Sequence, residues 1–283
     1  MTSPRTLLNA WNLQAKRQLG QNFLSDPSTA RAIVDRAGLS PDETVLEIGA
    51  GLGALTVPAA RRARRVYALE TDGRLVDLLG AELAAADLAE TATVIKADIL
   101  KFDIPAFAAE RGVSRFAVLG NLPYHISSQV LAKLVAERAV ISRAVLMFQR
   151  EMADRIMAGP GGRDYGRLAV LVAYCAKVRP LLGVAAPRFY PRPKIDSTVL
   201  AFDFVDPPHP ARDEAFLFRV VRAAFGQRRK TLRNALSGGD LGLSAAEAEV
   251  GLEAAGIDPT RRAETATVAE FVALSHALPR RTD

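Results

Sequence analysis

The sequence of 283 residues predicts an α/β fold, in which a parallel sheet carries helices on both faces and a small all-helical part follows at the C-terminus. Two observations lead to this prediction. From Thr44 onward, short apolar runs rich in β-branched residues alternate with helical segments, which is the pattern of a doubly wound sheet. After the segment 206–210, where prolines interrupt regular structure, the remaining patterns are all helical.

The strands are expected where apolar runs are bounded by turn residues. These runs are residues 44–48, 66–69, 93–95, 116–119, 144–148 and, after a proline-rich segment, 197–204. Between residue 148 and the proline-rich segment, the pattern predicts helix. Two further helices are expected ahead of the sheet, opening at Pro4 and Pro27, because proline favours the first turn of a helix and each proline follows a capping residue.

These patterns divide the chain into three predicted parts. Residues 1–41 hold the N-terminal helices, residues 42–205 the sheet domain and residues 206–283 the helical domain. The second boundary follows from the prolines of segment 206–210, which is typical of a linker because consecutive prolines do not continue a strand. The length suits one sizeable domain with a small appendage.

Composition and charge narrow the class of protein. Lys and Arg number 37 against 31 Asp and Glu, which favours a polyanionic partner, although a solvated basic surface would give the same balance. The longest apolar stretch, 168–176, is too short to cross a bilayer, and it holds the single cysteine, Cys175. One buried cysteine excludes a disulfide framework and a cysteine-ligated metal site. We therefore expect a soluble, cytoplasmic protein that uses neither a membrane nor a metal.

A glycine-rich loop, residues 47–56, closes the first predicted strand and opens a helix. Its glycines, which include Gly49 and Gly51, let the backbone approach a ligand at the carboxyl edge of the sheet. With Ala54 these glycines also fit the dinucleotide fingerprint, and Glu70 stands where a ribose-binding acid belongs for either ligand. The loop alone does not separate NAD from S-adenosylmethionine.

Three further features favour S-adenosylmethionine. An acid, Glu47, stands just before the loop, Asp98 follows the third strand, and residues 121–124 follow the fourth strand. Glu70 can accept both ribose hydroxyls and Asp98 can accept an adenine amino proton. Taken singly these acids are ordinary strand-end residues. Together, on successive strand ends, they predict a methyl-donor site.

The tetrapeptide Asn121-Leu122-Pro123-Tyr124 predicts the chemistry. The N6 amine of adenine is a poor nucleophile because its lone pair is delocalised into the ring. The side-chain carbonyl of Asn121 and the backbone carbonyl of Leu122 can each accept one N6 proton, which aims the lone pair at a sulfonium methyl. Pro123 makes the turn rigid and Tyr124 can stack on the base. His125 is interpreted as structural, and the alternative for the whole tetrapeptide is a plain strand-to-helix turn.

In order along the chain, these motifs resemble those of the ribosomal RNA adenine N6-dimethyltransferase family, which has a small-subunit branch and an antibiotic-resistance branch acting on large-subunit RNA. Residues 16–24 look like the family's N-terminal cofactor segment. The resemblance spans most of the chain and implies a Rossmann-like class I methyltransferase sheet. It also implies cofactor contacts by Asn22, Leu24, Gly49, Gly51, Glu70, Asp98 and Asn121.

The segment 189–197, called the late loop below, resembles the family's loop in which an aromatic residue and two prolines close over the target base. The resemblance implies that Phe189 and Tyr124 sandwich a flipped adenine, each stacked face contributing about 1 to 3 kcal/mol. Ile195 stands where the family has valine, which is a small departure.

A cluster of cations without any acid predicts the RNA contact. If one helix runs through Gly226, the cluster apart from Arg228 lies within an arc of about 100°, opposite an apolar face. Its members are Arg219, Arg222, Arg229, Lys230 and Arg233. Such a stripe suits phosphates, although an arginine-rich face can also serve only solubility.

Residues 224–234 resemble the small-subunit branch. The resemblance implies dimethylation of two adjacent adenosines in the 3′-terminal hairpin loop of small-subunit (16S) RNA, within a pre-ribosomal 30S particle. We expect a monomer, because the sequence shows no long exposed apolar stripe. Three alternatives stay open. They are the same chemistry on large-subunit RNA, an NAD-dependent dehydrogenase, and a ribosome-assembly factor that mainly binds RNA.

Overall fold

The computed structural model describes residues 2–227 and 229–280, and the chain forms two compact units. The first, the sheet unit, comprises the chain up to Ala153 together with Val178–Phe204. The second, the helical unit, comprises Asp154–Lys177 and the chain from Val205 onward. Residues 154–177, which the sequence analysis placed with the sheet, belong to the helical unit because their helix packs against the helix that follows the linker.

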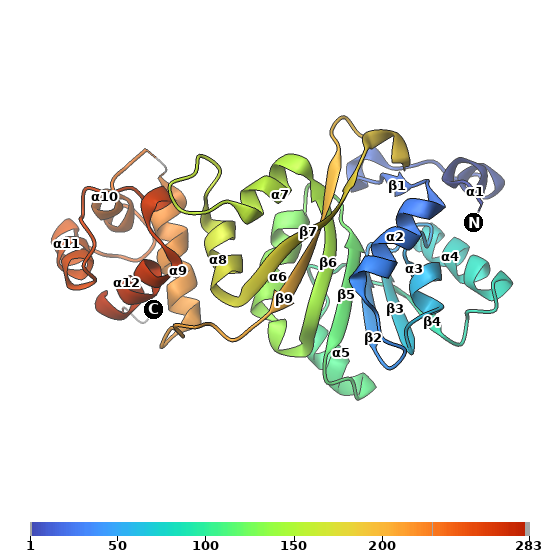
Figure 1. The fold of residues 1–283 in the computed structure, drawn as a ribbon, viewed down its shortest axis with the longest axis horizontal. Coiled ribbons are helices and arrows are strands. Elements are labelled where there is room, and N and C mark those ends of the chain that lie inside the picture. The colour runs from blue at the N-terminus through green and yellow to red at the C-terminus, as the bar shows by residue number, and fades with distance from the viewer. Residues whose placement is uncertain (1, 228, 281–283) are drawn as a thin grey trace. The chain divides into compact units, whose positions relative to one another are not determined.

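A mixed sheet of seven strands in the order β4-β3-β2-β5-β6-β9-β7 forms the centre of the sheet unit (Figure 1). The strands are β2 (Thr44–Ile48), β3 (Arg65–Glu70), β4 (Ala92–Lys96), β5 (Phe116–Asn121), β6 (Ile141–Gln149), β7 (Ala176–Val184) and β9 (Ser197–Phe204). From β4 to β6 the strands are parallel, and β9 pairs antiparallel with β6. All six predicted strands are confirmed.

The strand β7 corrects the sequence analysis, which placed helix over this stretch. Most of its side chains are exposed or only partly buried, so it lacks the apolar run that marks the central strands. It also contains Pro180, which has no N–H to donate and is tolerated at the edge of a sheet, where β7 lies.

Helices cover both faces of the sheet, and Figure 1 shows α2 and α3 in front of the strands and α6 behind them. The helices before β7 are α1 (Pro4–Ala10), α2 (Pro27–Ala37), α3 (Thr56–Ala60), α4 (Gly73–Ala85), α5 (Ile104–Arg111), α6 (Ser127–Ala136), α7 (Arg150–Met157) and α8 (Arg167–Cys175). The two predicted proline openings are confirmed. Ser3 accepts from Thr6 N–H at the start of α1, and Asp26 accepts from two N–H groups at the start of α2.

Short elements connect these layers. They are the two-residue strands β1 (Phe23–Leu24) and β8 (Phe189–Tyr190) and the 3-10 helices η1 (Arg17–Leu19), η2 (Arg138–Val140), η3 (Ala186–Arg188) and η4 (Ala263–Thr265). The pair β1–β8 is antiparallel and forms a small second sheet. It joins the N-terminal segment to the late loop, although these segments are far apart in sequence.

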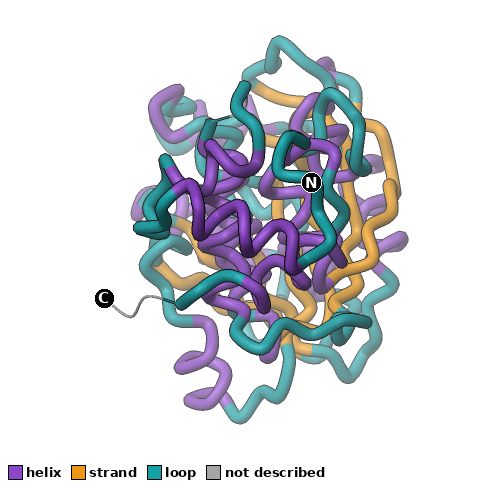
Figure 2. The backbone as a smooth tube through the Cα atoms, turned by 90° about the vertical axis from the view of Figure 1, so that its left-hand side faces the viewer, coloured by secondary structure: helices purple, strands orange, loops and turns teal. Residues whose placement is uncertain are grey.

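The helical unit continues from α8 with four more helices, α9 (Glu214–Gly226), α10 (Leu232–Ser237), α11 (Ala245–Ala254) and α12 (Val268–Ala277). Capping boxes at Ser244 and Thr267 start α11 and α12. The single cysteine, Cys175, is buried, as expected. Figure 2 colours the helices purple and the strands orange, and within the described residues no helix is long and apolar enough to span a membrane.

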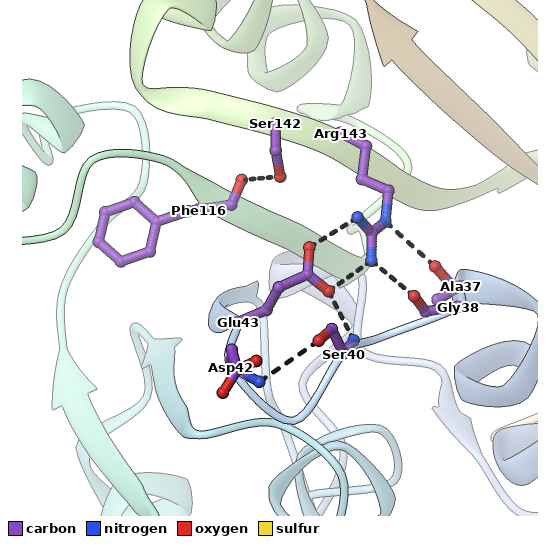
Figure 3. Close-up of polar contacts among 8 residues, drawn as sticks. All are labelled: Ala37, Gly38, Ser40, Asp42, Glu43, Phe116, Ser142 and Arg143. Carbon is purple, nitrogen blue, oxygen red and sulfur yellow. Dashed lines mark hydrogen bonds and ion pairs between the residues drawn. The ribbon is translucent and has the colours of Figure 1, made fainter.

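Arg143 of β6 holds the sheet to the end of α2 (Figure 3). Its Nη1 and Nη2 atoms donate to the two carboxylate oxygens of Glu43 at 2.6 and 2.7 Å, and Nε and Nη2 also donate to the carbonyls of Ala37 and Gly38 at 3.1 and 2.8 Å. Burial acts to raise the pKa of Glu43, but Arg143 and the N–H of Ser40 outweigh it, so the pKa is lowered. One guanidinium thus satisfies a carboxylate and two helix-end carbonyls.

Replacing this arginine is expected to destabilise the sheet unit. Arg143→Ala leaves the two carbonyls without this donor and Glu43 with only the N–H of Ser40, so the free energy of unfolding should fall by about 2 to 3 kcal/mol. Urea unfolding measures the change. Arg179→Ala is the control, because Arg179 lies 3.7 Å from Asp203 in an exposed pair, which should contribute less than about 1 kcal/mol. Equal losses in the two variants would contradict this account.

Candidate active site

A pocket opens where the carboxyl ends of β2, β3 and β5 meet the segment that follows β4. Its empty space, counted with its open mouth, is about 920 Å³, a size typical of cofactor sites. The pocket brings together most of the predicted site residues: Asn22, Leu24, Gly49, Gly51, Glu70, Asp98, Asn121, Leu122, Pro123 and Tyr124 all line it. Parallel strands cause this convergence, because their carboxyl ends share one edge of the sheet.

The glycines of the loop after β2 allow this close approach. Gly49 and Gly51 have φ values of 72° and 55°, a left-handed region that other residues rarely adopt. A Cβ on Gly51 would lie 3.1 Å from the ring of Phe23, which also lines the pocket. The loop therefore offers backbone rather than side chains to a ligand. Gly53 has a different role, since a Cβ there would clash with the side chain of Leu79 of α4.

Glu70, the last residue of β3, fastens this loop to the sheet. Its Oε2 accepts from the N–H of Gly51 at 2.9 Å, and its Oε1 accepts from the N–H groups of Thr71 and Asp72 at 2.8 and 2.9 Å. Only 7% of the residue is exposed. A carboxylate offers about four acceptor sites, so one site on Oε2 remains. A contact with one ribose hydroxyl is compatible with this network and stays a prediction.

Asp98 lies beside Glu70 because Ala97 N–H donates to the Glu70 carbonyl at 3.0 Å. One oxygen of Asp98, Oδ1, accepts from Leu100 N–H at 3.0 Å, which orients the carboxylate. The residue lines the pocket without an ion pair among the described residues. The predicted contact of Asp98 with an adenine amine is compatible with this placement and stays a prediction.

Asn121 ends β5 with its side-chain amide fixed in one orientation. Its Nδ2 donates to the backbone carbonyl of Asn22 at 3.0 Å. Because the amide nitrogen faces that carbonyl, the side-chain carbonyl oxygen of Asn121 is left to accept from another group. Nothing in the local sequence predicts this contact, which joins residues 99 positions apart.

The N-terminal segment is held against the pocket by charges that the sequence analysis missed. Lys16 Nζ lies 2.7 Å from Asp72, and Lys16 N–H donates to the side chain of Gln21 at 2.7 Å. Burial acts to raise the pKa of Asp72, but the interaction with Lys16 outweighs it and the pKa is lowered. A lysine shortly before the segment 20–24 is too common a feature to be recognised as its anchor from sequence.

The two aromatic residues predicted to stack on the base differ in position. Tyr124 lines the pocket, its hydroxyl lies 3.1 Å from Ser197 Oγ, and burial raises its pKa. Phe189 is only 4% exposed, packs in the apolar core that includes Leu24 and Val184, and is not among the lining residues. The stacking role of Phe189 therefore stays a prediction.

Glu47 of β2 is a buried acid at the floor of the pocket. It is 2% exposed, and its Oε2 atom has no hydrogen-bond partner among the described residues. Burial raises the pKa of Glu47 to about 8, and the negative charge of Glu70 adds to the shift. Such an unpaired acceptor inside a polar pocket is typical of a ligand site.

The predicted basic stripe is not one helical face. The helix α9 ends at Gly226, and α10 begins after Thr231, whose hydroxyl accepts from Asn234 N–H. The predicted continuous helix is therefore wrong, because the threonine cap starts a new helix. On the predicted apolar face, Leu217, Val221, Ala224 and Leu232 are buried, whereas Phe225 is only partly buried.

The cations of this cluster are consequently dispersed. Arg219 and Arg222 lie on α9, Arg229 and Lys230 in the connection, and Arg233 on α10, whereas Arg228 lies outside the described residues. Arg222 pairs with Asp240, and Arg233 lies 3.3 Å from Glu249. Arg229 and Lys230 are exposed. Within the described part of the chain, no group of His, Cys, Asp and Glu is arranged to hold a metal ion.

The raised pKa of Glu47 should make stability depend on pH. Between about pH 4.5 and 8 the folded protein keeps a proton that the unfolded chain releases, so the free energy of unfolding falls as pH rises, by at most about 1.4 kcal/mol per pH unit. Glu47→Gln should flatten this dependence and be the more stable protein at pH 8. Urea midpoints measured across this range test it, and an unchanged pH slope in the variant would contradict the assignment.

Known proteins similar to this chain cover nearly all of it. The chain is 50% identical over 279 residues to the ribosomal RNA small subunit methyltransferase A of Desulforapulum autotrophicum, covering 98% of this chain and 97% of that protein. It is 43% identical over 279 residues to the protein of that name from Geobacillus thermodenitrificans, with 97% and 94% covered.

Solved structures similar to this chain are also ribosomal RNA or adenosine methyltransferases. A dimethyladenosine transferase from Plasmodium falciparum is 25% identical, with a TM-score of 0.72 over 89% of this chain and 95% of that chain. The 23S rRNA methyltransferase ErmE is 26% identical, with a TM-score of 0.66 over 91% and 99%. A model of the family described as ribosomal RNA adenine dimethylase matches residues 12–278. The chain therefore belongs to the ribosomal RNA adenine dimethylase family.

Proposed function

We propose that this chain transfers methyl groups from S-adenosylmethionine to N6 of two adjacent adenosines in the 3′-terminal hairpin loop of small-subunit ribosomal RNA. Each adenosine is dimethylated during assembly of the small subunit. The observation that carries the proposal is the fixed amide of Asn121, whose side-chain carbonyl oxygen has no donor among the described residues, in a pocket that Glu70 and Asp98 also line. The names of the relatives support the small-subunit substrate.

The residues that line the pocket suit the cofactor. The backbone of Gly49 and Gly51 would hold the methionine part, Glu70 would accept from the ribose, and Asp98 would accept from the adenine amine. Asn22 and Leu24 cover the site, and Glu47 offers its unpaired oxygen from below. When bound, the sulfonium supplies an electrophilic methyl group.

Positioning accounts for the reaction of the amine. The carbonyl oxygens of Asn121 and Leu122 each accept one N6 proton, which localises the lone pair on nitrogen and directs it at the methyl carbon. The N–C bond forms as the S–C bond breaks, and the charged product amine loses a proton to water. The ring of Tyr124, held by Ser197, supports the base during the transfer. No protein base with a tuned pKa is needed.

The helical unit is proposed to contact the RNA mainly through Arg229 and Lys230. Both are exposed, whereas Arg222 and Arg233 have acidic neighbours that compete with phosphates. A cytoplasmic location and action as a monomer on a pre-ribosomal 30S particle belong to the same proposal.

The second candidate is methylation of large-subunit RNA, which the similarity to ErmE favours. A mainly RNA-binding assembly role is compatible with either.

Loss of the Asn121 amide should abolish turnover. Asn121→Ala removes one acceptor for the N6 protons, so kcat should fall by about 100-fold or more, while S-adenosylhomocysteine affinity in a calorimetric titration changes little. His125→Ala is the matched control, because this exposed neighbour contacts neither reacting group and should leave kcat within about twofold. A proportional loss of cofactor affinity in Asn121→Ala would refute the assigned role.

The substrate is tested by methyl transfer from labelled S-adenosylmethionine to purified unmethylated small subunits, large subunits and naked RNA. Dimethyladenosine on small subunits alone is the expected result, because loop adenosines enter a pocket without melting a duplex. Label on large-subunit RNA would support the second candidate. A chain that binds small subunits without labelling any RNA would support the assembly role.

A further inference from the structure

The late loop exposes a tyrosine and two cations in alternation. Tyr190, Arg192 and Lys194 are exposed, Tyr190 to 37%, whereas the intervening residues Pro191 and Pro193 are partly buried. The prolines therefore face the protein while the three other side chains face solvent. Proline also restricts the backbone, so a loop of this kind loses less conformational freedom when a ligand binds it.

Both ends of the late loop are attached to the pocket. At its start, Phe189 and Tyr190 pair with Leu24 and Phe23 in the β1–β8 sheet, and both partners line the pocket. At its end, Ser197 contacts the hydroxyl of Tyr124, which also lines the pocket. The exposed side chains between these ends consequently lie along the border of the pocket.

The charge of this border is positive and unpaired. The acid of the loop, Asp196, accepts from Arg150 Nη2 at 2.8 Å and from Ala186 N–H at 2.9 Å, so its charge is used within the fold. Among the described residues, Arg192 and Lys194 have no acidic partner within ion-pair distance. Cations that have no internal partner attract a polyanion most strongly.

We propose that Tyr190, Arg192 and Lys194 bind the single-stranded RNA next to the target adenosine. Arg192 and Lys194 contact phosphates of the flanking nucleotides, and the ring of Tyr190 stacks on a neighbouring base. The contact holds the strand while the target base enters the pocket beside it. This inference rests on the proposed function, because it places the reacting adenosine in that pocket.

A double variant that removes both positive charges tests the phosphate contacts. Arg192→Ala combined with Lys194→Ala should weaken binding to unmethylated small subunits about tenfold at moderate salt and reduce the slope of log K against log salt by about 1.4, at roughly 0.7 per contact. The matched control is Arg61→Ala with Arg64→Ala, two exposed arginines just before β3, at the opposite edge of the sheet. An unchanged slope, or an equal change in the control, would overturn the proposal.

The stacking contact is tested at Tyr190. Tyr190→Ala should raise KM for the RNA about tenfold with KM for S-adenosylmethionine unchanged, and Tyr190→Phe should restore the value because it keeps the ring. Equal KM values for the RNA in the Ala variant and the unaltered protein would show that Tyr190 does not contribute to RNA binding.

Crosslinking locates the surface directly. The chain has a single cysteine, and Cys175 is buried, so Lys194→Cys provides one accessible thiol for a photoreactive label. Crosslinks to nucleotides adjacent to the methylated adenosines are expected, and crosslinks confined to distant RNA would overturn the proposal. If the unaltered protein methylates small subunits but these variants behave like it, this inference alone fails. If the unaltered protein methylates no RNA, the proposed function fails.

Discussion

The parallel alignment of β2, β3, β4 and β5 is the constraint on which the whole site depends. In their register, Ile48 lies beside Leu69 and Gly120, and Glu70 lies beside Lys96. Parallel strands end at the same edge of a sheet, so the loops that follow them meet in space. The glycine loop, the acids and the tetrapeptide with Asn121 reach one pocket for this reason. At the other end of these strands, the two hydrogen bonds from Arg143 to Glu43 join the start of β6 to the residue before β2.

The N-terminal segment connects the two halves of the pocket. Its backbone carbonyl at Asn22 orients the amide of Asn121, the ring of Phe23 lies against Gly51, and Leu24 pairs with Phe189 of the late loop. Residues 19–24 of this segment line the pocket beside the glycine loop and the end of β5.

Three buried acids, Glu47, Glu70 and Asp72, have different surroundings. Glu70 receives three backbone N–H groups, Asp72 receives Lys16, and Glu47 receives no charge partner, so burial raises its pKa to about 8. Unpaired positive charge is instead found outside the pocket, on Arg192 and Lys194 of the late loop and on Arg229 and Lys230 of the helical unit. The distribution suits a polar ligand inside the pocket and a polyanion across its border.

The sequence by itself determined the fold class, the six strands it predicted, the two capped helices and the convergence of the glycine loop, Glu70, Asp98 and Asn121. These features depend on local patterns, and the parallel connection then brings strand ends together without further information. Only the tertiary structure showed the edge strand β7, the break between α9 and α10 and the burial of Phe189. It also decided the contacts of Asn22 with Asn121 and of Lys16 with Asp72. These features depend on which distant segments pack together, and short-range periodicity carries no record of that packing.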